Sequence, residues 1–191
     1  MRATQATETI TTVTTARRLH RHARPARQHA DQDRIRIATL ERGDAEAVLA
    51  MLGRCSPATL YHRFHGVTDG LSHATQVLAG ATGQDAYGAW SADSCVGLAC
   101  LAVSSDGSAD IGVLVEDGWK RRGVGSALVL ALVGRARERQ LTSLVADVLA
   151  DDQYILPLLA RIGPVATSLA YGGYTVRVGL EPRTAASSDQ A

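Results

Sequence analysis

Seven consecutive residues combine three cations with two glycines, in the order Lys120-Arg121-Arg122-Gly123-Val124-Gly125-Ser126. An apolar run, 111–115, precedes them, and a long aliphatic segment, 127–133, follows. This order predicts a strand, a glycine turn and a helix. Glycines let a ligand approach the backbone closely. The first N–H groups of a helix have no partner within it, and together with the positive end of the helix dipole they attract anions. The segment therefore favours binding of a phosphate or pyrophosphate.

Two structural explanations compete with this interpretation. Gly123 and Gly125 are equally suited to a tight strand-to-helix connection, and the three cations to an ordinary solvated surface. The spacing also departs from the dinucleotide fingerprint G-x-G-x-x-G, because Leu128 stands where the third glycine belongs, and the G-K-[ST] of a P-loop is missing. Taken alone, the seven residues favour a phosphate site only slightly, so the surrounding elements must decide.

Length and composition restrict the class of protein. The 191 residues are enough for one domain, and a hydrophobic content of 46% is typical of a globular core. A net charge of +1 gives no global attraction to nucleic acid or to an anionic membrane, and we expect neither as a partner. The cysteines lack metal-ligand spacing and a histidine in a matching context, so we expect small buried thiols in a cytoplasmic protein, at Cys55, Cys95 and Cys100.

Both ends of the chain are polar. Residues 1–33 carry six arginines against three acidic residues and few large apolar side chains, so we expect a disordered basic tail. This tail lacks the interleaved aromatic residues that favour nucleic-acid binding, and its composition also resembles that of a transit peptide. We expect a second disordered tail at 183–191 and one folded domain at 34–182.

The pattern of apolar residues within the domain predicts a sheet with covering helices. A turn signal, Asp106-Gly107, joins two of the strands. We expect helices at 43–52 (stopped by Gly53), 56–64, 72–80, 123–139 and 151–161 (kinked by Pro157), and strands at 34–40, 86–91, 95–103, 110–115, 142–149, 165–169 and 174–178. This order predicts an α+β fold with one mixed, mostly antiparallel central sheet flanked by helices.

At the predicted strand-to-helix junction, the chain resembles the GNAT superfamily of N-acetyltransferases. Their acetyl-CoA-binding motif is [Q/R]-x-x-G-x-[G/A], and residues 120–125 match it with Lys120 where Gln or Arg is usual. The resemblance covers about residues 34–180 and is strongest at 109–163. It implies the GNAT fold and acetyl-CoA as co-substrate, with no metal.

Three further segments resemble Pat-type protein lysine acetyltransferases in particular. Residues 56–64, SPATLYHRF, are similar to their S-P-x-x-x-Y-x-R-F segment, and residues 115–120, VEDGWK, to their V-x-D-x-W-Q run. Residues 148–152 are similar to V-L-A-E-N, with Asp152 in place of Asn. The resemblance implies acetylation of exposed lysine side chains on a protein substrate, with acyl-CoA synthetases as the family-typical targets.

The resemblance also implies roles for individual residues. A glutamate that accepts the proton of the amine corresponds to Asp110, whose carboxylate is one methylene shorter; otherwise Asp110 only ends the Asp-Gly turn. Gly112 suits either a bulge or a position that makes room for a helix. The implied cofactor-binding residues are Val113, Leu114 and Val115 on the strand, Lys120, Arg121, Arg122, Gly123, Val124, Gly125 and Ser126 in the loop, and Asp152 after the next strand.

Some positions depart from the family pattern and keep other functions open. Leu159 stands where GNAT enzymes often have a tyrosine that protonates the leaving thiolate, and Tyr154 comes about five residues too early. Arg63 is suited either to steering an acidic surface around a target lysine or to orienting a helix, and we expect His62 and His65 on the surface. The alternative functions are acetylation of a small-molecule amine, a catalytically impaired acyl-CoA-binding regulator, and a nucleic-acid-associated protein acting through its basic tail.

Overall fold

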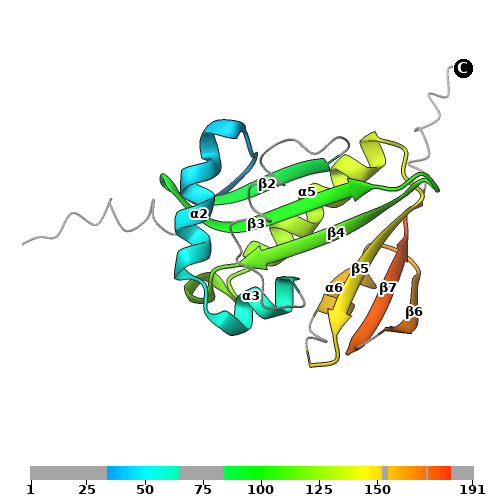
Figure 1. The fold of residues 1–191 in the computed structure, drawn as a ribbon. Helices are drawn as coiled ribbons and strands as arrows, with labels where there is room; N and C mark the ends of the chain where they lie inside the picture. Colours follow the sequence, from blue (N-terminus) through cyan, green and yellow to red (C-terminus); the bar gives the residue numbers. More distant parts are fainter. Residues whose placement is uncertain (1–33, 65–83, 152–154, 171, 182–191) are drawn as a thin grey trace, which may run out of the picture.

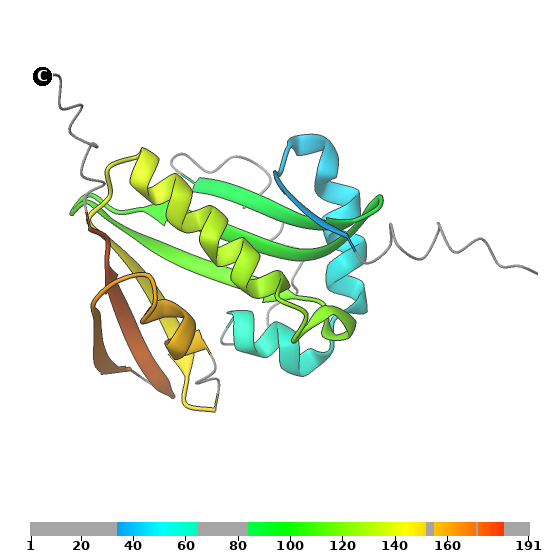
Figure 2. The ribbon, with the colours of Figure 1, turned by 180° about the vertical axis from the view of Figure 1, so that it is seen from behind.

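The computed structural model describes residues 34–64, 84–151, 155–170 and 172–181. Their seven strands form one sheet in the order β1-β2-β3-β4-β5-β7-β6, in which every pair is antiparallel except β4 and β5. Helices cover both faces of the sheet (Figures 1 and 2). The predicted α+β class with a mixed, mostly antiparallel sheet is therefore confirmed. The expected tails at 1–33 and 183–191 and the expected helix at 72–80 lie outside the described residues.

The N-terminal part places two helices beside the first strand. β1 (Ile35–Thr39) leads through a short 3-10 turn, η1 (Arg42–Asp44), into α2 (Ala45–Arg54), and α3 (Pro57–Phe64) follows. The expected stop at Gly53 is wrong, because α2 runs through it to Arg54. Gly53 does not adopt the left-handed backbone of a glycine cap, and the helix ends where Cys55 becomes extended, with φ −75° and ψ 142°.

Three strands form the predicted meander, namely β2 (Gln84–Ser91), β3 (Ser94–Val103) and β4 (Ser108–Val115). Gly107 adopts φ +79° between β3 and β4, and the carboxylate of Asp106 accepts a hydrogen bond from the N–H of Ser108. This turn starts β4 two residues before the expected position. The pairing of β2 with β3 is irregular between Ala89 and Trp90. The pairing of β3 with β4 runs unbroken through Gly112, so Gly112 does not form a bulge.

The C-terminal part begins with η2 (Asp117–Trp119) and α5 (Val124–Glu138), followed by β5 (Ser143–Leu149). α6 (Leu156–Leu159) is a single turn, so the expected helix over 151–161 is wrong in the described residues. Pro157 lies in the first turn of α6, where its missing N–H breaks no bond, and the expected kink is therefore absent. β6 (Val165–Ala170) and β7 (Gly173–Gly179) form the predicted hairpin, with Gly172 at φ +80°.

The core lies on both faces of the sheet. On one face α5, which carries the fully buried Leu128 and Leu132, packs against β2, β3 and β4. Figure 2 shows this helix lying across the sheet. On the other face α2 packs Val48 and Met51 against Leu98 and Leu114. Alternate β4 residues therefore contact different helices, which places Asp110, Gly112 and Leu114 on the face of α2 and α3. None of the helices in the described ranges combines the length and apolar composition needed to cross a membrane.

Candidate active site

The strands β4 and β5 diverge after three shared positions. Ser108, Ala109 and Asp110 pair with Ser143, Leu144 and Val145. Beyond this point β4 remains paired with β3 and β5 with β7, so the two backbones separate (Figure 1). We call the unpaired parts of the two strands, residues 111–115 and 146–149, the wedge. Its vertex lies at Asp110.

One edge of the wedge presents unpaired backbone groups. The carbonyl of Ser108 accepts the N–H of Ser104, directly after β3, and the N–H of Glu116 donates to the carbonyl of Val96 on β3. These two bonds fix the alternation of hydrogen-bonding directions along β4. The N–H and C=O groups of Ile111, Val113 and Val115 consequently point away from β3, toward the wedge. The N–H and C=O groups of Leu114 point to β3, and the residue is only 3% exposed. Of the three predicted strand contacts, Val113 and Val115 therefore present backbone to the wedge, and Leu114 does not.

The glycine turn lies next to this edge. Gly123 adopts φ +81°, which a residue with a Cβ strongly disfavours, and its carbonyl accepts the first hydrogen bond of α5, from Ala127. The N–H groups of Val124, Gly125 and Ser126 make no backbone hydrogen bond within the described part of the chain. A Cβ on Gly125 would lie 3.7 Å from Val115 Cγ2, so the start of α5 packs beside the free end of β4. The structure thus brings an anion-binding helix terminus to the wedge.

The two arginines of the basic triplet differ in their surroundings. Arg122 places its guanidinium carbon 5.1 Å from the centre of the Trp119 ring. Arg121 is exposed and adopts φ +62°, an uncommon backbone for a residue with a side chain. Neither arginine forms an ion pair with a carboxylate of the described residues. Their charges therefore stay available to a ligand at the start of α5.

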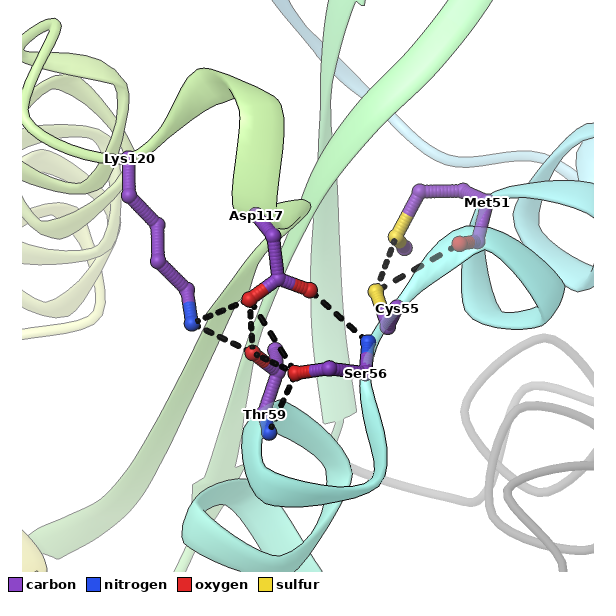
Figure 3. Close-up of polar contacts among 6 residues, drawn as sticks. All are labelled: Met51, Cys55, Ser56, Thr59, Asp117 and Lys120. Atoms are coloured by element: carbon purple, nitrogen blue, oxygen red, sulfur yellow. Dashed lines mark hydrogen bonds and ion pairs between the residues drawn. The ribbon is translucent and has the colours of Figure 1, made fainter.

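Lys120, the single lysine of the chain, points away from the helix terminus toward α3. Its Nζ lies 2.9 Å from Asp117 Oδ1 and also donates to the Thr59 hydroxyl (Figure 3). Asp117 further accepts hydrogen bonds from Thr59 Oγ1 at 2.7 Å and from the N–H of Ser56 at 2.7 Å. The structure thus places the first residue of the matched motif in a network that joins the glycine turn to α3.

The network has an electrostatic consequence. Hydrogen bonds from Thr59, from the Ser56 backbone and from Lys120 stabilise the charged carboxylate and hold the pKa of Asp117 well below its usual range. The Ser56 hydroxyl adds a further bond at 3.1 Å and also accepts the N–H of Thr59, which caps α3. One ionised carboxylate therefore fixes α3 relative to the β4–α5 loop.

Asp110 lies at the vertex with an exposed side chain. The Ser104 hydroxyl donates to its Oδ2 at 3.5 Å. Asp110 pairs with Ala102 on β3 and Val145 on β5, so the backbone on both sides of it is held in the sheet. The backbone of Asp110 is therefore fixed in the sheet, and its carboxylate is exposed at the vertex of the wedge.

Arg63 of α3 lies over the middle of β4. A Cβ on Gly112 would overlap the guanidinium of Arg63, so the glycine makes room for this side chain. Arg63 Nη2 donates to Cys100 Sγ at 2.9 Å, and Cys100 is the neighbour of Gly112 on β3. Of the two interpretations of Gly112, the structure has the one in which a small residue admits a helix.

Other predicted site residues lie elsewhere or outside the described residues. Leu159, the last residue of α6, is fully buried in the core. His62 Nε2 of α3 lies 3.8 Å from Asp151 Oδ2, which follows β5. No group of three or more metal-ligating side chains occurs in the part of the chain that the structure describes. Asp152, Tyr154 and His65 lie outside that part.

The cysteines are free thiols. Cys95 is buried and Cys55 half-buried, and burial raises the pKa of each thiol to about 11. Both thiols are therefore neutral near pH 7 and unsuited to act as nucleophiles. This agrees with the expectation that they are small packing residues.

The model of the acetyltransferase (GNAT) family matches residues 56–163, which is more than half of the chain. The chain belongs to the GNAT acetyltransferase family. The match begins at the Ser56 cap of α3 and contains β4, the glycine turn and α5. No curated protein matches the sequence significantly.

Solved structures share the GNAT fold at low sequence identity. The GNAT domain of PAT from S. lividans has 18% identity and a TM-score of 0.66, over 76% of this chain and 90% of that chain. YncA from Salmonella typhimurium, a putative acetyltransferase with its cofactor acetyl-CoA, has 16% identity and a TM-score of 0.60, over 82% and 99%. The N-acetyltransferase PaiA from Thermoplasma acidophilum, in complex with coenzyme A, has 10% identity and a TM-score of 0.59, over 76% and 99%.

Proposed function

We propose that this GNAT protein is an acetyl-CoA-dependent N-acetyltransferase that acts on protein lysine side chains in the cytoplasm. The observation that carries the proposal is the wedge, whose free β4 edge leads directly to the unsatisfied N–H groups at the start of α5. Two of the similar structures carry coenzyme A or acetyl-CoA, which supports this choice of donor.

The donor would bind along β4. Its pyrophosphate would accept hydrogen bonds from Val124, Gly125 and Ser126, with Arg121 and Arg122 supplying positive charge. Its pantetheine arm would add to the backbone of Val113 and Val115 as a further strand does. This places the thioester toward Asp110, since Val115 and Asp110 lie about 17 Å apart along an extended strand.

The chemistry requires a neutral amine. A lysine amine has an ordinary pKa of about 10.4 and is mostly protonated near pH 7. In the proposed reaction the Asp110 carboxylate accepts a proton from the amine, directly or through a water. The amine nitrogen then forms a bond to the thioester carbonyl carbon, and the carbon–sulfur bond breaks. Coenzyme A leaves as the thiolate, which takes up the second proton that the nitrogen releases as the amide forms. A free N–H of β4 would stabilise the oxyanion that develops on the carbonyl.

The choice of a protein lysine rests on α3. This helix carries the segment that resembles Pat-type enzymes and packs on β4, with Arg63 over Gly112. The similarity to the PAT domain from S. lividans supports the same choice, at 18% identity. The family-typical targets, acyl-CoA synthetases, are the first acceptors to test.

The decisive experiment measures transfer of labelled acetyl groups. The purified protein is incubated with radiolabelled acetyl-CoA and either an acyl-CoA synthetase, lysine peptides or small amines, and binding of acetyl-CoA is measured by calorimetry. We expect transfer to protein lysine. Asp110→Asn should lower the rate about a hundredfold or more while the affinity for acetyl-CoA is unchanged, and Asp110→Glu should retain a base.

The outcomes separate the alternatives. Transfer to small amines alone would assign the protein to that class of acetyltransferase. Binding of acetyl-CoA without transfer to any acceptor would make the protein an acyl-CoA-binding regulator. Absence of binding would overturn the proposal altogether.

A further inference from the structure

Among the residues that the structure describes, the guanidinium of Arg63 has no anionic partner. Its Nη2 donates to the Cys100 thiol at 2.9 Å, and its Nε is buried and has no hydrogen-bond partner. No carboxylate of the described residues lies within ion-pair distance of it. Its guanidinium carbon also lies 5.2 Å from the centre of the Phe64 ring. The side chain thus contacts Cys100 and Phe64, and no described residue supplies a counter-charge to it.

A half-buried guanidinium without a carboxylate partner among the described residues is energetically unfavourable. Arginine remains charged at any pH near neutral, and its five N–H groups form a fork that matches a carboxylate. A thiol sulfur is a weak acceptor, and burying a charge without a counter-charge is costly. Arginines of α2 and α5 that face a neighbouring element have carboxylate partners, as in Arg54–Glu116 and Arg135–Asp85. Arg63 differs from them because it is half-buried and forms no ion pair with a described residue.

The position of Arg63 relates it to the proposed reaction. Its guanidinium occupies the space above Gly112, and Asp110 lies two residues earlier on the same face of β4. Residues two apart on a strand are separated by about 7 Å. An extended peptide that lies along β4 on the α3 face of the sheet, apart from the edge assigned to the pantetheine arm, would repeat this spacing, because its own side chains at i and i+2 also share one face. A lysine amine near Asp110 and a carboxylate near Arg63 would then belong to residues two positions apart in one acceptor peptide.

We propose that Arg63 binds a carboxylate of the acceptor, so that the preferred substrates are lysines with an aspartate or glutamate two residues away. The proposal rests on the proposed function and narrows its substrate class. Arg63 acts in it as a specificity-determining residue, and Gly112 acts by leaving space for the guanidinium. Arg63 takes no part in the transfer of the acetyl group.

The test uses matched peptides. Each peptide has one central lysine and one variable position, which lies one or two residues before or after the lysine. The variable position carries Glu in one peptide of a pair and Gln in the other, so that the two differ only in charge. The measured quantities are kcat/KM for acetylation and, independently, the dissociation constant of the fluorescein-labelled peptides from fluorescence anisotropy. For wild type we expect the Glu peptide to be favoured about ten- to a hundredfold when Glu lies two residues from lysine.

Three variants separate recognition from a structural role. Arg63→Met keeps a similar volume and should bring the Glu-to-Gln ratio to about one, while Arg63→Lys keeps the charge without the fork and should give an intermediate ratio. Gly112→Ala should lower the ratio with Arg63 still present, because its Cβ displaces the guanidinium. The affinity for acetyl-CoA and the thermal midpoint of each variant show whether α3 remains in place.

Two results would contradict the proposed role of Arg63. Equal constants for all Glu and Gln peptides with wild type would overturn the proposal, and so would a preference for Glu that survives in Arg63→Met. If no peptide is acetylated, the proposed function fails, and the anisotropy ratios still decide whether Arg63 binds a carboxylate.

Discussion

Asp110 and Val145 form the last pair of residues that β4 and β5 share. On one side of this pair the sheet is continuous, and on the other side the backbone of β4 has hydrogen-bonding partners only on β3 among the described residues. The carboxylate that the proposed reaction needs therefore lies where the unpaired edge begins.

Proline substitutions distinguish the β4 N–H groups that point into the wedge from those that point to β3. Val113→Pro removes an N–H that points into the wedge and should leave the fold intact, since proline is tolerated at a free strand edge. The dissociation constant for acetyl-CoA, measured by calorimetry, should rise about tenfold through loss of one hydrogen bond. Leu114→Pro removes an N–H that points to β3 and should unfold the protein. Val113→Ala controls for the lost side chain, and equal affinities of Val113→Pro and Val113→Ala would contradict the prediction.

Gly123 and Gly118 offer a matched pair in the loop. Neither would place a Cβ within 4 Å of another residue, but Gly123 alone of the two has a positive φ, +81°. Gly123→Ala should cost about 1–2 kcal/mol in backbone strain and weaken binding of acetyl-CoA by distorting the start of α5. Gly118→Ala should change neither. Similar affinities for the two variants in calorimetry would show that the left-handed turn is unimportant for the donor.

The network around Asp117 predicts a pH dependence of stability. Since its folded pKa lies below the unfolded value of about 3.9, its contribution is fully present above about pH 5 and is lost as the pH falls through the folded pKa. Asp117→Asn should reduce the free energy of unfolding at pH 7 by about 1–2 kcal/mol, discounted because the side chain is exposed to solvent.

Urea denaturation at several pH values measures this effect. Wild type should lose stability between pH 5 and pH 3 more steeply than Asp117→Asn, because the variant has no carboxylate to protonate at this position. Parallel curves for the two proteins would mean that Asp117 does not stabilise the contact between α3 and the loop.

Two further glycines should respond to alanine with opposite signs. Gly134 lies on the exposed side of α5 with open space around it, so Gly134→Ala should stabilise the protein by about 0.5–1 kcal/mol. Gly173 lies where a Cβ would overlap the carbonyl of Val148, so Gly173→Ala should push β7 from β5 and cost about 2–3 kcal/mol. Thermal unfolding measures both. A loss of stability in Gly134→Ala would indicate a contact that the structure lacks.

Local signals in the sequence predicted most of the fold. The alternation of apolar residues located all seven strands within a few residues, and Asp106-Gly107 located the β3–β4 turn. The errors concern residues whose effect depends on their surroundings. Gly53 ends no helix because its φ is not positive, and Pro157 kinks none because it lies in the first turn of α6.

The candidate site was predictable where it is formed by backbone, and less so where it is formed by side chains from distant segments. The glycine turn and the strand before it carry their own signal. Ser56 and Asp117 are 61 residues apart in the sequence, and nothing in either segment indicates their hydrogen bonds. The same holds for Arg63 and Gly112, because a small residue on a strand does not reveal which side chain will occupy the space above it.

The scarcity of lysine has a practical consequence for enzymology on this protein. Its sole ε-amino group is already engaged by Asp117 and Thr59, so antibodies against acetyl-lysine should find almost nothing to recognise on the catalyst itself. A blot of a reaction mixture would then report modification of the acceptor against a nearly blank background. Amine-reactive dyes would likewise attach to few places on the chain. The acceptor can therefore be labelled while this protein stays largely unlabelled.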